Sequence, residues 1–171
     1  MRNNSLPLRE RPIDIFFIVV FALFIVTSGI ADLIPTLGIE MSPDSPNFLA
    51  RANYSYAYGT DPLFLHTASR PAPIWMRFVT GLSAFVYPIF YVGFIIAAVK
   101  GWNGIQVPAV MYATSISVIT GIVVFGVEFF GEPQWRCQNI PKFLSLNLPY
   151  VLIPLLLLLR MRKEKPFNRK F

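Results

Sequence analysis

The chain has few charged side chains, one histidine and one cysteine. Only 14% of its 171 residues are charged, whereas 54% are hydrophobic. Soluble globular domains carry about a quarter charged residues, so water is not the main solvent of this protein. Its single histidine, His66, and single cysteine, Cys137, offer no spacing suited to metal ligands, and one cysteine allows no internal disulfide. The sequence therefore predicts neither a metal nor a cofactor.

Long apolar stretches make up most of the sequence. A membrane helix needs roughly 20 mostly apolar residues to cross about 30 Å of hydrocarbon. Four stretches meet or approach this length, at residues 13–34, 74–99, 105–130 and 143–159. They predict an all-α membrane protein, in which residues 12–160 form a four-helix transmembrane bundle. Residues 1–11 precede this bundle and residues 161–171 follow it as a basic tail.

Basic residues are concentrated on one side of the predicted membrane. Ten of the 15 Lys and Arg residues lie before the first span, after the fourth, or in the short connection between the second and third. The positive-inside rule therefore predicts that both termini are cytoplasmic and that the long loop of residues 35–73 is lumenal. This loop contains an N-glycosylation sequon, Asn53-Tyr54-Ser55. The net charge of +6 forms no stripe for nucleic acid, although the tail can contact anionic lipids.

Ionisable side chains within the spans are candidates for function, because a buried charge in a bilayer must be paired or hydrated. Asp14 lies at the cytoplasmic edge, where solvent or Arg11 can satisfy it. Asp32 and Glu128 lie near the lumenal ends of the first and third spans, so both are expected to face one apolar chamber. Alternatively, each only caps a helix end and is hydrated at the interface.

Other polar side chains of the second and fourth spans fall in or near the same layer. An apolar chamber with a few polar groups at one end suits a sterol-like molecule or an amphipathic cation. The aromatic residues, 15% of the chain, supply plausible walls. The polar residues of these two spans are Thr80, Ser83, Tyr87, Asn147 and Tyr150.

Catalysis by soluble-type constellations is not supported. Gly-rich phosphate loops are missing, and neither Ser83 nor Ser117 has an intramembrane histidine to activate it. Acid chemistry by paired carboxyls is the reaction type that remains. A protonated member of the pair Asp32 and Glu128 can donate to an alkene or epoxide, while its partner and aromatic faces stabilise the developing cation.

Four ordered segments of the chain form a recognisable set. They are Ile30-Ala31-Asp32-Leu33-Ile34-Pro35, Asp61-Pro62-Leu63 with Pro73-Ile74-Trp75-Met76, Pro108-Ala109-Val110-Met111-Tyr112, and Leu148-Pro149-Tyr150-Val151-Leu152-Ile153-Pro154. Each motif alone is weak, but the ordered set is fairly specific and extends over about residues 12–160. With these segments the chain resembles the EXPERA family, and within it most closely the sigma-2 receptor branch.

The resemblance implies an endoplasmic-reticulum protein, a homodimer and a lumen-side pocket for sterols, isoprenoids or lipophilic amines. It makes Asp32 the cation-pairing aspartate, Asp61 the loop aspartate that supports it, and Tyr150 a pocket tyrosine. The full set of expected ligand contacts is Asp32, Asp61, Ser83, Tyr87, Tyr112, Glu128, Asn147 and Tyr150.

One departure from the family affects the predicted activity. The family carries a glutamate in the middle of the second helix, whereas this chain has Leu82 and Ser83 there, and no histidine on that helix. Glu128 can replace the missing carboxylate from the third helix. The leading hypothesis is a membrane protein that binds a sterol or another lipophilic ligand. The alternatives are an intramembrane isomerase or cyclase using Asp32 and Glu128, and a trafficking or scaffolding protein.

Overall fold

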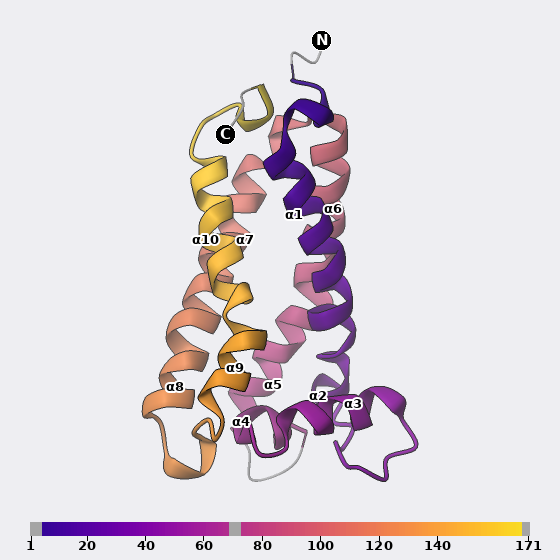
Figure 1. Ribbon diagram of the computed structural model, residues 1–171, viewed down its shortest axis with the longest axis vertical. Helices are drawn as coiled ribbons and strands as arrows, with labels where there is room; N and C mark the ends of the chain where they lie inside the picture. The colour runs from indigo at the N-terminus through magenta and orange to yellow at the C-terminus, as the bar shows by residue number, and fades with distance from the viewer. Residues whose placement is uncertain (1–4, 69–72, 169–171) are drawn as a thin grey trace.

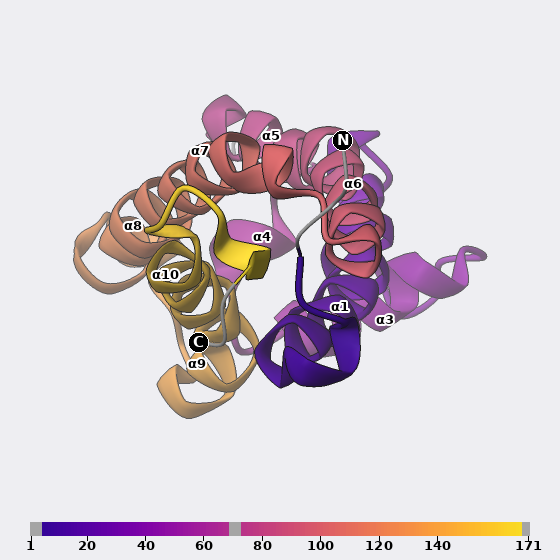
Figure 2. The ribbon, with the colours of Figure 1, turned by 90° about the horizontal axis from the view of Figure 1, so that it is seen from above.

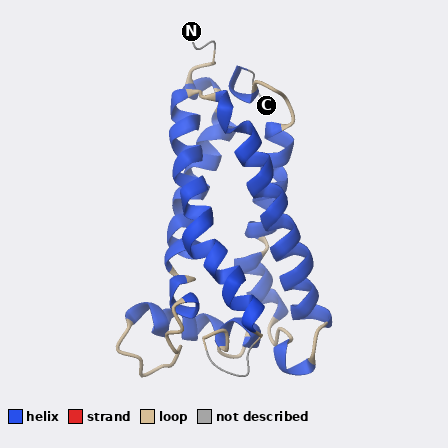
Figure 3. Ribbon diagram, turned by 180° about the vertical axis from the view of Figure 1, so that it is seen from behind, coloured by secondary structure: helices blue, strands red, loops and turns tan. Residues whose placement is uncertain are grey.

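The computed structural model describes residues 5–68 and 73–168, and none of these residues lies in a strand. Four helices are long and apolar enough to cross a membrane (Figures 1 and 3). They confirm the predicted spans, and the fourth begins earlier than expected because Asn139 accepts a hydrogen bond from the Lys142 amide and caps it. The four helices are Pro12–Thr36, Ile74–Lys100, Asn103–Phe130 and Ile140–Met161.

Three of the spans change to π-helical geometry at one point along their length. The first consists of α1 (Pro12–Phe24), the π-helical segment η2 (Ile25–Ile30) and α2 (Leu33–Thr36). The second consists of α5 (Ile74–Gly81), the π-helical segment η3 (Leu82–Val86) and α6 (Tyr87–Lys100). The third runs from the 3₁₀ turn η4 (Asn103–Ile105) through α7 (Gln106–Val118) and the π-helical segment η5 (Ile119–Val124) to α8 (Phe125–Phe130).

Prolines mark the breaks within the second and fourth spans. Pro88 lacks an amide hydrogen and its ring clashes with the preceding turn, which accounts for the wide π turn before it. The fourth span is also interrupted just before a proline. Its two segments, α9 (Ile140–Asn147) and α10 (Pro149–Met161), meet at Leu148. Pro88 and Pro149 each lie at the start of a new regular segment. Pro154 lies inside α10.

The long loop folds into two helices that the sequence reading did not predict. Asn47 caps α3 (Phe48–Ala57) by accepting hydrogen bonds from the Leu49 and Ala50 amides. Asp61 caps α4 (Pro62–Leu65), where Pro62 occupies the favoured first position. The sequon residue Asn53 is buried in α3, and its amide nitrogen donates to the Ala31 carbonyl at 2.8 Å. A side chain held in this way is not available for glycosylation.

The spans pack as two pairs joined side by side. Helix α1 packs on α6, α10 packs on α7, and α6 contacts α7 (Figure 2). We call the end of the bundle at which the chain ends lie, at the top of Figure 1, the terminal end. The aromatic core, with rings from the first three spans, extends to this end, where Phe167 contacts Phe94. We call the opposite end, which carries α3, α4 and the 3₁₀ turn η6 (Pro133–Trp135), the carboxylate end.

A buried ion cluster ties the terminal end together. Asp14 is fully buried and accepts charged hydrogen bonds from Arg11 at 2.9 Å and from Arg160 at 2.8 and 2.9 Å. The prediction that Asp14 lies in the interface and is satisfied by solvent or Arg11 is therefore wrong in part. Arg11 does pair with it, but Arg160 of α10 replaces solvent.

The predicted tail also packs against the bundle. Phe167, in the 3₁₀ turn η7 (Pro166–Asn168), is fully buried between the guanidinium groups of Arg11 and Arg160, at 4.7 and 5.9 Å from its ring. Its carbonyl accepts from the Leu6 amide, just before the short turn η1 (Leu8–Glu10), and its amide donates to Asn103. The tail therefore closes the terminal end, where both ends of the described chain meet.

Candidate functional site

Three carboxyl groups from separate elements meet at the carboxylate end. Asp32 lies between η2 and α2, Asp61 caps α4, and Glu128 lies in α8. Asp61 is within electrostatic range of Asp32 and within hydrogen-bonding contact of Glu128. The sequence predicted that Asp32 and Glu128 lie at a similar depth in the bundle. In the structure, Asp61 of the long loop lies near both of them.

Of the three carboxyls, Asp61 is held by the largest number of hydrogen bonds from its surroundings. One oxygen accepts from the Phe64 amide at 2.7 Å, and the other accepts from the Tyr56 hydroxyl at 3.0 Å. Asn147 donates to the same Tyr56 hydroxyl at 2.6 Å, which connects α9 to the site. Burial raises the pKa of the Asp61 carboxyl above its ordinary value, although the hydrogen bonds from Phe64, Glu128 and Tyr56 oppose the rise.

Glu128 is more deeply buried and has no donor. Its side chain is 1% exposed, and neither carboxyl oxygen accepts a hydrogen bond from an N–H or hydroxyl donor among the described residues. Its backbone carbonyl accepts from the Cys137 amide at 3.0 Å, which fixes the third connection against α8. A buried carboxylate without donors is strongly disfavoured, so the protonation state of Glu128 is part of the chemistry of this site.

Asp32 is half-buried, and it is held by the second span. Ser83 of η3 is its side-chain hydrogen-bond partner. The Asp32 carbonyl accepts from Thr36 at 2.6 Å, and Thr36 in turn donates to Thr80 of α5 at 3.0 Å. Tyr150 lies within electrostatic range of Asp32. Asp32 is therefore anchored on one side and keeps accessible surface on the other.

The π-helical segments lie next to the residues that form this site. Segment η2 ends two residues before Asp32, η3 contains Ser83, and η5 ends four residues before Glu128. A π turn adds a residue and so rotates everything that follows it on the helix, and such turns are frequent at functional sites. The irregular turns thus set the direction in which both acidic side chains point.

The expected contacts Tyr87 and Tyr112 lie in a different layer from the carboxyls. Tyr112 donates to Tyr91 at 3.2 Å, and Tyr87 hydrogen-bonds Ser115 at 3.3 Å. Both rings belong to the aromatic core of the bundle. Tyr150 borders both layers, since it reaches Thr27 of η2 at 2.6 Å and lies near Asp32. Ligand contact by Tyr87 and Tyr112 remains a prediction.

Tyr56 is the site residue that the sequence reading missed. It lies on α3, in a loop where no helix was expected, and burial together with the nearby Asp61 charge raises the pKa of its phenol. Lys142 of α9 also ties α3 to the fourth span. Its ammonium donates hydrogen bonds to the carbonyls of Ser55 and Tyr56 at 3.2 and 2.9 Å. The pair Asp61-Pro62, a cap followed by proline, was the available signal that this loop is ordered.

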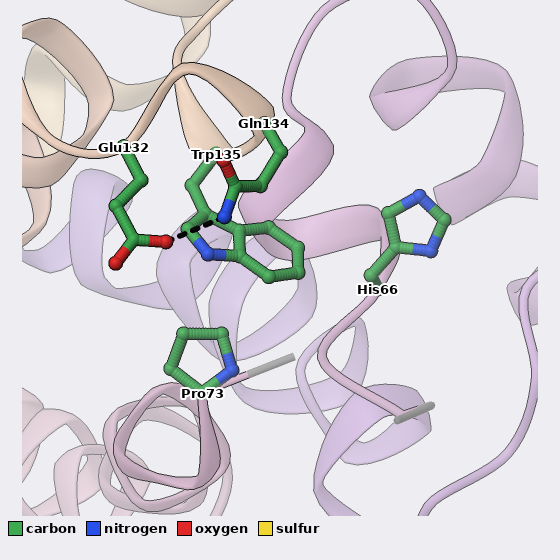
Figure 4. Close-up of a pocket in the computed structure, with 5 residues that line it drawn as sticks. All are labelled: His66, Pro73, Glu132, Gln134 and Trp135. Atoms are coloured by element: carbon green, nitrogen blue, oxygen red, sulfur yellow. Dashed lines mark hydrogen bonds between the residues drawn. The ribbon is translucent and has the colours of Figure 1, made fainter. Parts of the chain in front are cut away.

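An open pocket of about 500 Å³ lies on the outer surface of the carboxylate end (Figure 4). Its lining side chains come from η6 and from the chain flanking α4 and α5. Trp135 forms one wall and belongs to the same apolar cluster as Leu63 and Phe64, which follow Asp61. The pocket is lined by His66, Pro73, Glu132, Gln134 and Trp135.

No group of His, Cys, Asp and Glu in residues 5–68 and 73–168 is arranged to hold a metal ion.

Residues 48–161 match the family model of EXPERA, the expanded EBP superfamily. This match runs from α3 to the end of α10 and so includes Asp61 and Glu128, while Asp32 precedes it. Comparison with curated proteins and with solved structures gives no match.

Proposed function

Because the chain belongs to the EXPERA family, we propose that it binds a sterol or another lipophilic ligand, including lipophilic amines, with Asp32 as the polar anchor. One observation carries this proposal: at the carboxylate end, Asp61 contacts Glu128 and lies within electrostatic range of Asp32. Among the described residues the ion pairs are made by Asp14 at the other end, and none of them joins a basic side chain to these carboxyls. Buried acidic groups without a protein cation are suited to a ligand that brings one.

The test is the substitution Asp32→Asn, which keeps the shape of the side chain and removes its charge. We expect loss of binding of a lipophilic amine to the purified protein, while the thermal unfolding temperature stays close to that of the wild type. Asp44→Asn changes an exposed loop aspartate and should leave the affinity unchanged. Equal affinity for the amine in Asp32→Asn and wild-type protein would remove Asp32 from the pocket.

A second candidate function, isomerisation or cyclisation of a sterol or isoprenoid, is favoured by the burial of Glu128 beside a second carboxyl. A carboxylic acid there can add its proton to one alkene carbon, and a neighbouring carboxylate can remove a proton from the carbon next to the resulting cation. The double bond moves and no co-reactant is consumed. Membranes carrying the wild type or Glu128→Gln, incubated with sterol or isoprenoid substrates, should then differ in products. Identical product profiles would count against an enzyme.

The membrane setting is part of the same proposal. We propose that the protein is a homodimer of the sigma-2 receptor branch in the endoplasmic-reticulum membrane, with both termini cytoplasmic and the carboxylate end lumenal. The charge distribution supports this orientation, because ten of the 15 basic residues precede the first span, follow the fourth or lie between the second and third in the sequence. Chemical cross-linking of the protein in native membranes tests the dimer.

A further inference from the structure

The unpaired oxygens of Glu128 lead to a further property of this site. Both oxygens are buried, and neither receives a hydrogen bond from any described donor. The neighbour in hydrogen-bonding contact is Asp61, whose carboxyl cannot donate when it is ionised. Two ionised carboxylates in contact at a buried site repel each other strongly, and one proton shared between them removes the repulsion.

The donors around the pair show which member holds that proton. Asp61 already accepts from the Phe64 amide and the Tyr56 hydroxyl, and both bonds stabilise its ionised form. Glu128 has no such support. The proton therefore belongs on Glu128, which can donate it to Asp61. Even then one Glu128 oxygen still has no donor among the described residues.

The other titratable groups near the pair do not supply a proton or a compensating charge. Burial raises the pKa of the Tyr56 phenol and of the Cys137 thiol, so both stay neutral donors near neutral pH. Lys142 directs its ammonium at two backbone carbonyls. Asp32, on the far side of Asp61, adds a further negative group.

We propose that Asp61 and Glu128 hold one proton when no ligand is bound and release it when a cationic ligand binds beside them, so that ligand binding is coupled to proton release. This inference rests on the proposed binding function. A cation beside the pair favours the ionised form of Glu128, because opposite charges within a few ångström stabilise each other. One positive charge enters as one proton leaves for the solvent, and the net charge of the pocket does not change.

The coupling has a definite sign. Because the empty pair binds one more proton than the occupied pair, the affinity for a fixed cation rises with pH. In the window where only the empty pair is protonated, the rise is about tenfold per pH unit for one proton. A neutral sterol brings no charge, so its affinity should change little over the same window.

Isothermal titration calorimetry with tetraphenylphosphonium, a lipophilic cation that has no proton of its own, tests the coupling. Titrations in two buffers of different ionisation enthalpy give the number of protons released per ligand. We expect about one for the wild type and about none for Glu128→Gln, whose amide mimics the neutral acid. Glu40→Gln changes an exposed glutamate of the long loop, outside the pocket lining, and should retain the wild-type value.

The possible results separate the coupling from the binding function. Binding without proton release by the wild type overturns the coupling and leaves the binding proposal intact. Unchanged proton release in folded Glu128→Gln overturns the assignment to this pair. If tetraphenylphosphonium does not bind, the same count is made with a lipophilic amine, corrected for the amine's own ionisation. If neither compound binds, the binding proposal itself fails.

An infrared measurement keeps the inference testable if Glu128→Gln does not fold. The empty wild-type protein should show the carbonyl stretch of a protonated carboxylic acid, and a bound cation should remove that band. Persistence of the band in the occupied protein would contradict the coupling.

Discussion

At the scale of single residues, Tyr56 connects the parts of the site that come from different elements. Its hydroxyl donates to Asp61 and accepts from Asn147, so one atom joins α3, the cap of α4 and α9. Chemically, a neutral phenol is well suited to this position, because it orients a carboxylate without neutralising it.

Tyr56→Phe should therefore destabilise the protein by about 1–3 kcal/mol, the cost of leaving buried hydrogen-bonding groups unpaired. Loss of this donor also raises the pKa of the Asp61 carboxyl further, because a bond to the ionised form is removed. Thermal unfolding followed by tryptophan fluorescence measures the change. The matched control is Tyr58→Phe, two residues along at an exposed position, where we expect almost no effect. Equal unfolding temperatures for the two variants would show that the Tyr56 hydroxyl contributes nothing.

The residues of the site were only partly predictable. Alternating spans bring the ends of the first and third helices to the same level, so the common depth of Asp32 and Glu128 follows from topology alone. The contact of Asp61 with Glu128 depends on how a 39-residue loop folds back, and apolar periodicity says nothing about that. Tyr56 was missed for the same reason. Asp14 was misread because the position of Arg160 in space cannot be read from a separation of 146 residues.

At the scale of helices, close contact between the first two spans depends on Gly29 in η2. A Cβ atom at this position would lie 2.9 Å from Cγ of Pro88, a distance that real side chains do not tolerate. The contact lies between the π-helical segment that precedes Asp32 and the start of α6, which follows the segment containing Ser83. Separation of these helices would therefore weaken the bond between Asp32 and Ser83.

Gly29→Ala should destabilise the protein by about 1–3 kcal/mol through overpacking, and should lower the affinity for a lipophilic amine. Gly93→Ala is the matched control, because a Cβ at this glycine of α6 meets nothing within 4 Å. Since alanine favours a helix over glycine by about 1 kcal/mol, the control should be neutral or slightly stabilising. Thermal unfolding and ligand binding on both variants measure the difference. A Gly29→Ala protein as stable as Gly93→Ala would mean that the two spans separate without cost.

The elements themselves divide into those with a strong sequence signal and those without one. Hydrophobic runs of membrane length predicted the four spans, because every buried backbone group in a bilayer must be satisfied within a helix. The helices α3 and α4 are short, and their signals are local caps rather than periodicity. The π-helical segments η2 and η5 contain no proline, and they arise from packing between spans, which the sequence of one helix does not record.

At the scale of the whole molecule, the two ends of the bundle are built differently. The terminal end is filled with aromatic rings and is closed by the ion cluster of Asp14 and by Phe167. The carboxylate end contains the acidic groups and the irregular turns. An even number of spans brings both chain ends to the same side of the bundle, and at that end the Leu6 amide donates to the Phe167 carbonyl. Which end faces the cytoplasm remains a prediction from charge.

A closed terminal end implies that the tail stabilises the entire bundle. Phe167 is fully buried, packs edge-to-face against Phe94 and contacts both arginines that bind Asp14. Phe167→Ala should therefore destabilise the protein by about 3–5 kcal/mol, the usual cost of removing a buried aromatic ring. Thermal unfolding of the purified protein measures this loss.

Phe130→Ala is the control for Phe167→Ala, because it removes the same ring from a position that is 84% exposed in the bundle. Its effect should stay within about 0.5 kcal/mol, as for most surface substitutions. If Phe167→Ala unfolds at the wild-type temperature, the tail is not part of the folded bundle. Because the carboxyls lie at the opposite end, a folded Phe167→Ala protein should keep its affinity for a lipophilic amine, which would separate the stabilising end of the molecule from the end that binds.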